Sequence, residues 1–351
     1  MTDYPKITII IPTYRRPNLL KRAIYSVLKQ TYPHLQVCIY DNASGDETAR
    51  IVADIAKTDP RVRYHCHSDN IGGINNFAFG IKQVNTPFFS FLSDDDILLP
   101  DFLEVALKGF NSFPDAMFSA ASSIIMNDTG EVLNVSLNSW SRDGYFSPPE
   151  SMFNMVGGKQ LVCWTSVLFR QEVITEVGGL DIDVGWALDY DFMLRIAIRF
   201  PIVISKEPCA IFIYHQSSYS AKADFDHFWP GWKKLSQNIC ADERLPLDIR
   251  NHAADLLSGH FKMVLLYTAI QSMSQGNCED VVRISEVLRQ YLKLNFIALI
   301  VLGMAKLGKI PGFCKLIALA EHLRRKWNMA GKKSSQLNRD YGHFAQWLRT
   351  K

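Results

Sequence analysis

The 351-residue sequence predicts an α/β protein in which a Rossmann-like, mostly parallel sheet is flanked by helices and followed by a helical appendage. Three observations predict this class. The first third of the chain alternates short apolar runs with helical patterns, as in parallel sheets covered by crossover helices. After about residue 224, strand patterns stop and only helical patterns remain. A composition of 48% hydrophobic and 21% charged residues excludes disordered, collagen-like and low-complexity chains.

Two strand–helix units open the chain. Residues 7–11 are a continuous β-branched run, which suits a strand buried on both faces, and apolar residues recur at helical spacing over 19–28. The second unit has a strand over 35–40, after which Ser44 and Glu47 have the spacing of a capping box at the start of the next helix. The later elements follow from the same patterns: strands over residues 62–66, 88–92, 117–126, 132–137, 161–169 and 202–204, and helices over 74–84, from Pro100 and over 187–200.

These patterns place a domain boundary near residue 222, between a sheet domain (1–222) and a helical region (223–351) that is rich in basic residues. Residues 282–351 hold 14 Lys or Arg against three Asp or Glu. Apolar stretches over 294–305 and 313–323 lie among these cations, a composition that suits the surface of an anionic membrane. Packing on the sheet domain, or on a second copy in a homo-oligomer, explains the pattern equally well. No RNA- or DNA-binding module accompanies the charge, so no nucleic-acid partner is expected.

The cysteines and the N-terminus indicate a cytoplasmic protein. Seven scattered cysteines form no CxxC pair and no zinc-binding spacing, which favours a reducing compartment. The apolar run before Pro12 is too short for a signal-peptide core, and no run approaches the roughly 18 apolar residues of a spanning helix. The basic tail adds a second expected location, peripheral to the inner face of the plasma membrane.

Acidic residues cluster where predicted strands end. Residues 41–46 follow one strand and 94–96 follow another, and ligands of open parallel sheets bind beyond the carboxyl ends of the strands. Three adjacent carboxylates repel one another, so a hard cation such as Mg²⁺ or Mn²⁺ would stabilise them, although a polar loop or helix cap explains them equally well. Residues 12–16 follow the first strand and offer an aromatic ring for a base and cations for phosphate; an ordinary turn is the alternative.

In combination, these segments resemble inverting glycosyltransferases of the GT-A fold, in family 2. The resemblance covers residues 5–222. The matching segments are Ile9–Tyr14, Asp41–Asp46, Asn70–Gly80, Phe91–Pro100, Gly178–Asp181 and Leu188–Asp191, with the single residues Arg195, His215, Ser218 and Ser220. A Gly-rich nucleotidyltransferase loop and a GxGxxG dinucleotide motif are both missing after the first strand, which argues against those two enzyme classes.

The resemblance implies roles for individual residues. Those implied to bind the nucleotide are Pro12, Thr13, Tyr14, Arg16, Asp41, Asn70 and Asp94. Asp95 and His215 would hold Mn²⁺ or Mg²⁺, and Asp189 would be the base that deprotonates the acceptor hydroxyl. Trp164 is a weaker candidate for the acceptor site. Asp191 lies two residues after Asp189 and so points elsewhere; we expect it to pair with Arg195.

Two departures from the family pattern keep other interpretations open. The family often has an acidic residue at two positions where this chain has Ser93 and Leu188 instead. Asp189 also fits an ordinary acid in the first turn of a helix, His215 fits a structural histidine, and Trp164 fits a core residue.

The expected function is inverting transfer of a sugar from a nucleoside diphosphate, UDP or dTDP, to a hydroxyl of a glycan or lipid-linked acceptor in surface-polysaccharide (O-antigen or capsule) synthesis. A non-catalytic module that binds nucleotide sugar or glycan is the alternative.

Overall fold

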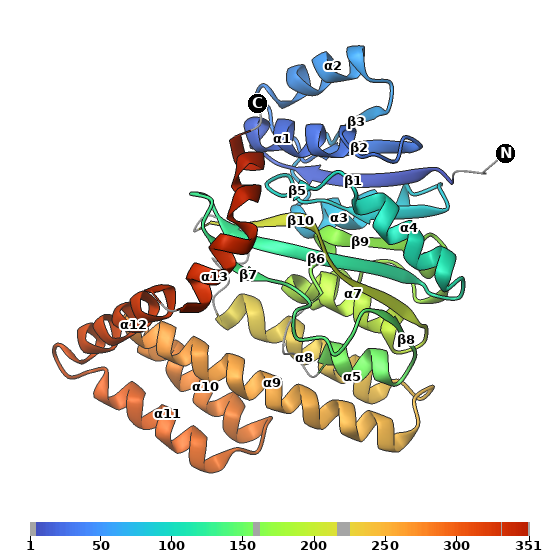
Figure 1. Cartoon of the computed structure of the whole chain (residues 1–351). Coiled ribbons are helices and arrows are strands. Elements are labelled where there is room, and N and C mark those ends of the chain that lie inside the picture. Colours follow the sequence, from blue (N-terminus) through green and yellow to red (C-terminus); the bar gives the residue numbers. More distant parts are fainter. Residues whose placement is uncertain (1–4, 157–161, 216–224, 331, 350–351) are drawn as a thin grey trace. The chain divides into compact units, whose positions relative to one another are not determined.

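A computed structural model of the chain describes residues 5–156, 162–215, 225–330 and 332–349. The chain forms two compact units (Figure 1). The sheet unit comprises Met1–Lys222 together with Leu337–Lys351, and the helical unit comprises Ala223–Gln336.

The first part of the sheet is parallel. Its strands are β1 (Ile7–Thr13), β2 (Leu35–Asp41), β3 (Val62–Cys66) and β4 (Phe88–Phe91), in the spatial order β3-β2-β1-β4. The helices α1 (Pro17–Leu28), α2 (Thr48–Thr58) and α3 (Gly73–Lys82) connect them. The chain moves outward from β1 to β3 and then returns to the other side of β1 with β4. The strand order therefore reverses between β1 and β4, which is where ligands bind in doubly wound sheets.

The second part of the sheet is mixed. It continues from β4 through β9 (Val167–Arg170), β6 (Phe118–Asn127) and β10 (Ile202–Tyr214) to β5 (Ile97–Leu98). Only β6 and β10 are parallel to each other among these; β9 is antiparallel to both β4 and β6. Two short strands, β7 (Val132–Val135) and β8 (Gly144–Phe146), pair with β6 and β10. The remaining helices of this part are α4 (Phe102–Ser112), α5 (Glu150–Val156), α6 (Val173–Glu176) and α7 (Leu188–Ala197), with the 3₁₀ segments η1 (Trp164–Ser166) and η2 (Ile182–Ala187).

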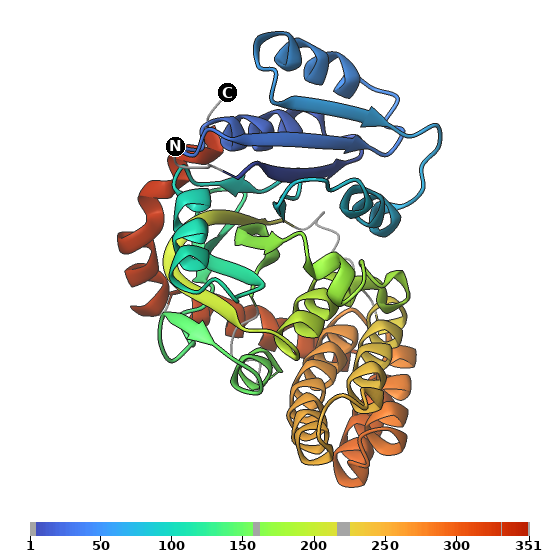
Figure 2. The same cartoon turned by 90° about the vertical axis from the view of Figure 1, so that its right-hand side faces the viewer.

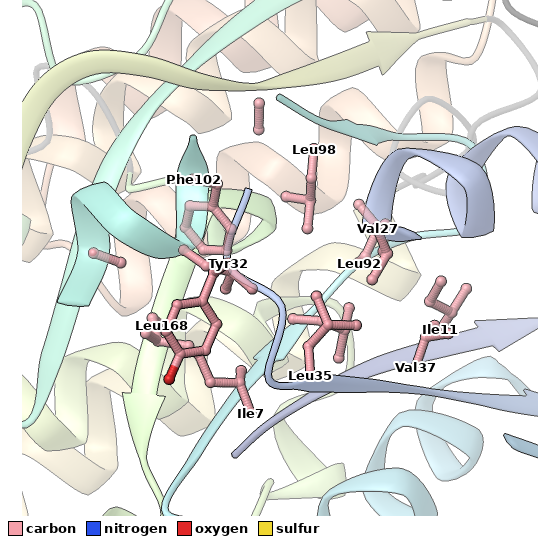
Figure 3. Close-up of a cluster of buried hydrophobic side chains, with 14 of the residues drawn as sticks. Ile7, Ile11, Val27, Tyr32, Leu35, Val37, Leu92, Leu98, Phe102 and Leu168 are labelled. Carbon is pink, nitrogen blue, oxygen red and sulfur yellow. The ribbon is translucent and has the colours of Figure 1, made fainter. Parts of the chain in front are cut away.

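Helices on both faces bury β1, as its apolar sequence predicts. Ile7 and Ile11 point into a cluster that includes Val27 of α1 and Phe102 of α4 (Figure 3). Ile10 points the other way, toward α3, where a Cβ on Gly80 would lie only 2.7 Å from the Ile10 side chain. Glycine at that position lets α3 approach the sheet closely, so both faces of β1 are covered.

Three local predictions are wrong, and the structure gives the reasons. The strand predicted over 161–169 begins at Val167, because Trp164–Ser166 form the 3₁₀ turn η1. Ser44 does not cap α2, because its N–H donates to Asp41 (3.0 Å) and its hydroxyl accepts from the Arg15 N–H (2.8 Å). The carboxylate of Asp46 accepts the Thr48 N–H instead, at 2.9 Å. The strand predicted over 202–204 extends to Tyr214, because two register shifts around Pro208 carry the pairing with β6 across a polar stretch.

The helical unit consists of long helices that pack along one another (Figure 1). They are α8 (Phe225–Ala241), α9 (Leu247–Ser274), α10 (Cys278–Gln290), α11 (Asn295–Leu307) and α12 (Phe313–Ala330). Phe261 of α9 lies edge-on between Trp229 and Trp232 of α8, at ring distances of 5.8 and 5.6 Å. Among the described residues, none of the helices has both the length and the apolar character needed to span a membrane.

The last residues of the chain return to the sheet unit. They form the end of α13 (Lys332–Tyr341) and the 3₁₀ segment η4 (Gly342–Arg349), which run along the outside of the sheet (Figure 2). Their apolar side chains cover a cluster formed by β5, β6, β7 and β10: Leu337, Tyr341, Phe344, Ala345, Trp347 and Leu348 lie on Ile97, Leu99, Ile124, Met126, Val132, Val135, Ile211 and Ile213. The sequence pattern assigns these residues to the helical region, whereas the structure packs them on strands.

Candidate functional site

The candidate site begins where β1 and β4 end, at the reversal of strand order. Thr13 is the last residue of β1, and Asp94 follows β4 by three residues. The Thr13 hydroxyl donates a hydrogen bond of 2.7 Å to Asp94 Oδ2. Pro12, also expected to line the nucleotide, is a buried part of β1 paired with Tyr40. The structure thus joins the two strand ends that the sequence identified separately.

Arg16 neutralises the first two acids of the run after β4. Its Nη1 lies 3.2 Å from Asp94 Oδ1 and 2.8 Å from Asp95 Oδ2. Burial, and then the nearby charge of Asp95, raise the pKa of Asp94 to about 6. A guanidinium on two adjacent carboxylates, at the start of a helix, also lies within reach of a phosphate group that enters the site.

Asp96 has a structural role that the sequence did not reveal. Its carboxylate accepts the Thr165 hydroxyl at 2.7 Å and the Ile213 backbone N–H at 2.9 Å. Burial raises its pKa well above the usual range of an aspartate. Because its partners lie 69 and 117 residues further along the chain, no local pattern could identify this role. The three acids therefore have different roles. Asp94 and Asp95 face the site, whereas Asp96 connects the loop after β4 to η1 and β10.

His215 lies beside Asp95. Its Nε2 is 2.8 Å from Asp95 Oδ2, although 120 residues separate the two in sequence. The antiparallel pairing of Ile97 with Ile211 explains the contact, because it brings the residues before β5 alongside the end of β10. Ser218 and Ser220, which accompany His215 in the family pattern, lie outside the described residues.

The donor set of Asp95 and His215 fits a divalent cation that also binds substrate. Within the described residues, no group of three or more His, Cys, Asp or Glu side chains could hold a metal ion. One carboxylate and one imidazole leave most coordination positions to phosphate oxygens and water, and Mg²⁺ at phosphate sites likewise has only one or two protein ligands, usually carboxylates. These residues therefore suit a metal that binds together with a diphosphate.

A second group of polar residues lies at the end of β2. Asp41 accepts hydrogen bonds from the Ser44 N–H (3.0 Å) and from the hydroxyl of Tyr64 (2.6 Å). The Asn42 amide donates to Asn70 Oδ1 at 2.8 Å, which holds the loop before α3 against the strand end. Tyr64 was missed by sequence reasoning, since a tyrosine in a short strand carries no signal of its own.

Tyr14 is partly exposed directly after β1. The Arg15 guanidinium lies 5.1 Å from the centre of its ring. Arg15 itself has a positive φ of 54°, an uncommon conformation for a residue with a side chain, and its backbone N–H is held by Ser44. The ring is therefore presented to solvent beside the ends of β1 and β2.

Asp189 and Asp191 have different surroundings in the first turn of α7. Asp189 is half-buried, its Oδ1 accepts the Tyr190 N–H at 2.7 Å, and it forms no ion pair in the described part of the chain. Burial raises its pKa to about 6. Asp191 pairs with Arg195 at 2.7 Å, which confirms the expected structural role. The turn η2 before Asp189 packs against α3.

Trp164 belongs to an aromatic cluster. Only 8% of the residue is exposed, and its ring stacks on Phe91 at 4.5 Å and lies 4.8 Å from Phe77. Both contacts are those of a core residue, so a contact with acceptor stays a prediction.

Comparison with known proteins identifies a family whose sequence pattern matches the part of the chain that contains β1 and β4. Residues 8–178 match the family model described as "Glycosyl transferase family 2". A GalNAc(5)-diNAcBac-PP-undecaprenol beta-1,3-glucosyltransferase of Campylobacter jejuni is 34% identical over 108 residues, which is 30% of this chain and 35% of that protein. Chondroitin synthase of Escherichia coli is 26% identical over 219 residues, 62% of this chain and 30% of the synthase. The chain thus spans about a third of the length of these relatives.

Solved structures share the fold. S. aureus TarS 1-349 in complex with UDP-GlcNAc has a TM-score of 0.60 at 13% identity, over 91% of this chain and 92% of that one. The mannosyltransferase PcManGT of Pyrobaculum calidifontis, in complex with GDP-Man and Mn²⁺, has a TM-score of 0.55 at 17% identity, over 99% of this chain and 86% of that one.

Proposed function

Residues 8–178 of this chain match glycosyl transferase family 2 and the chain has the GT-A fold, and from this premise we propose that it transfers a sugar from a nucleoside-diphosphate sugar to a hydroxyl group, with inversion. The observation that carries the proposal is the assembly of Thr13, Arg16, Asp94, Asp95 and His215 where the strand order reverses. Hydroxyl, guanidinium, carboxylate and imidazole groups at such a strand end suit a diphosphate with a divalent cation.

The donor nucleotide is proposed to be UDP or dTDP. Asp41 is fixed by Ser44 and Tyr64 as a hydrogen-bond acceptor, and each carboxylate oxygen retains a lone pair for an imide N–H of uracil or thymine. Tyr14 offers an exposed ring for stacking, and Asn70 in the loop before α3 and Pro12 near the end of β1 are proposed to complete the nucleotide site. Binding of diphosphate would draw Arg16 from the carboxylates toward phosphate oxygens.

Asp95 and His215 are proposed to hold Mn²⁺ or Mg²⁺. Bound there, such an ion stabilises the negative charge that develops on the nucleoside-diphosphate leaving group. Asp94 accepts the Thr13 hydroxyl at 2.7 Å and so joins the ends of β1 and β4 beside the proposed nucleotide site.

Asp189 is proposed to be the general base. Its carboxylate takes the proton of the acceptor hydroxyl as that oxygen attacks the anomeric carbon on the face opposite the leaving group, so the configuration inverts. A pKa of about 6 suits this role, because the group is ionised at neutral pH yet basic enough to accept a proton.

The acceptor is proposed to be a glycan or a lipid-linked saccharide, in the synthesis of a surface polysaccharide such as O-antigen or capsule. The Campylobacter relative is named for a PP-undecaprenol-linked saccharide and the E. coli relative for chondroitin, and both names support this class of acceptor. We propose a cytoplasmic location, peripheral to the inner face of the plasma membrane. A homo-oligomer, and a contact of Trp164 with acceptor, stay predictions.

Thermal unfolding with a panel of nucleotides tests the proposal. UDP, dTDP, GDP, CDP and ADP would each be added with and without Mn²⁺, since a ligand of the native state raises the melting temperature. A Mn²⁺-dependent rise with UDP or dTDP is expected, followed by release of that diphosphate from the matching sugar nucleotide when acceptor is supplied. A rise without any turnover on any acceptor would favour the non-catalytic binding module, and no rise would contradict the nucleotide site.

A further inference from the structure

Helix α11 of the helical unit buries small side chains and exposes large apolar ones, whereas an ordinary amphipathic helix buries its large apolar side chains. Helix α11 buries only Ala298, Val301 and Ala305. Its largest side chains point to solvent: Phe296 is 77% exposed and Leu299 is 66% exposed. A helix that packs only within its own unit buries its largest apolar residues, because burial of apolar area stabilises the packing. The exposed face of α11 is therefore built to contact something else.

The exposed residues form two stripes with helical spacing. The first runs along α11 and just beyond it, and the second along α12; Figure 1 shows where the two helices lie. Together these exposed stripes consist of Phe296, Leu299, Ile300, Leu307 and Ile310, and of Leu316, Leu319 and Leu323. Spacings of three, four and seven residues place the members that lie within α11 and within α12 on one side of their helix, and Ile310 follows in the turn after α11. Large apolar side chains exposed along one side of a helix mark an interaction site.

The charges around the stripes identify what they contact. No Asp or Glu occurs between Glu286 and Glu321, whereas that stretch holds four exposed lysines: Lys293, Lys306, Lys309 and Lys315. None of the four forms an ion pair with a described residue. Apolar side chains that insert among acyl chains, flanked by lysines that reach negative headgroups, are the features of helices that lie in a membrane interface.

A second copy of the chain fits these features less well. A two-fold dimer contact places the same surface against itself, so the lysines of both copies would meet with no acidic residue in the stretch to neutralise them. We therefore propose that the exposed stripes of α11 and α12 bind the surface of an anionic phospholipid bilayer. Membrane binding itself is argued without the proposed function. Its purpose, to bring the enzyme to a lipid-linked acceptor, rests on that function.

Sedimentation of the full-length protein with vesicles tests this inference. Vesicles of phosphatidylcholine alone are compared with vesicles that also contain phosphatidylglycerol, at low and at high salt. Binding is expected to require phosphatidylglycerol and to weaken as salt rises, because salt screens the lysines. Equal binding to both kinds of vesicle, or binding to neither, would overturn the proposal.

Matched variants separate the stripes from the rest of the helical unit. The double variant Leu299→Ser, Leu316→Ser should lose vesicle binding at least ten-fold, whereas Leu247→Ser should not, although Leu247 is equally exposed at 65%. The double variant Lys306→Gln, Lys309→Gln should bind about 25-fold more weakly, at about five-fold per lysine, while Lys234→Gln should bind normally. Circular dichroism checks that each variant remains folded.

Three further outcomes would overturn the inference. The first is unchanged vesicle binding by the serine variant, and the second is an equal loss in the Leu247 control. The third is a wild-type dimer in light scattering that the serine variant breaks, with no vesicle binding, which would assign the stripes to a second copy. The nucleotide melting assay separates this inference from the proposed function. Wild-type protein that responds to nucleotide but binds no vesicles overturns the inference alone, and the reverse result overturns the proposed function alone.

Discussion

Replacing Asp189 by asparagine should strongly reduce turnover and, at neutral pH, make the sheet unit more stable. Burial raises the pKa of Asp189 from 3.8 to about 6, so folding disfavours the charged form by up to about 3 kcal/mol. Solvent reaches part of the side chain, and we therefore expect about half of this value, ~1.5 kcal/mol. Asparagine removes the charge and keeps an Oδ1 that can accept the Tyr190 N–H. For a unit of this size the melting temperature should rise by about 3–6 °C at pH 7.

The pH dependence gives the sign of this effect. Below about pH 4 the aspartate is protonated in both the folded and the unfolded chain, so the variant and the wild type should be equally stable with respect to this group. As pH rises from about 4 to 6 the wild type loses stability relative to the variant, and the difference is constant above that range. Melting curves at pH 4 and pH 7 measure it.

Turnover should respond in the opposite direction. Loss of a general base lowers the rate by about 10²–10⁴-fold, and the kcat/KM of the wild type should fall about ten-fold per pH unit below pH ~6, where Asp189 takes up its proton. Asp183→Asn is the control, since Asp183 is exposed in the preceding turn, and neither stability nor rate should change. Near-normal transfer by Asp189→Asn, or a lower melting temperature at pH 7, would refute the assignment.

Three further changes test other contacts of the sheet unit. Asp95→Ala should remove the Mn²⁺-dependent rise in melting temperature with UDP; a retained rise would mean that the metal binds elsewhere. Asp191→Ala should lower the free energy of unfolding by about 3 kcal/mol in urea titration, because Arg195 loses a buried partner at 2.7 Å, and an unchanged midpoint would contradict this. Gly130→Ala should speed proteolytic cleavage of the C-terminal segment, because φ there is +89° and a Cβ would lie 2.8 Å from that of Ala345; unchanged cleavage would show that the segment adapts.

The architecture was readable from sequence because its signals are local. The β-branched run of β1 predicts a strand covered on both faces, and Ile10 and Ile11 do point to opposite layers. The location of the site followed from the rule that ligands bind at strand ends where the order reverses. Loop chemistry was less predictable: Ser44 has the spacing of a helix cap, yet Asp41 and Arg15 hold it in the loop.

The contacts that complete the site are long-range, and no periodic pattern contains them. Asp94, Asp95 and Asp96 are indistinguishable as a run, and only Thr165 and the end of β10 show that Asp96 faces inward. The resemblance to a family indicated His215 as a metal ligand, but its contact with Asp95 depends on the pairing of β5 with β10. The packing of residues 337–349 on the sheet was missed for the same reason, since an amphipathic helix does not specify its partner.

The most direct test of the central claim is a crystal structure of the protein with UDP and Mn²⁺. Uracil is expected beside Asp41 and Tyr14, together with a diphosphate and a metal ion that Asp95 and His215 coordinate. Arg16 should then contact phosphate rather than both carboxylates. Nucleotide bound away from the ends of β1 and β4, or a metal ion that contacts neither Asp95 nor His215, would contradict the account.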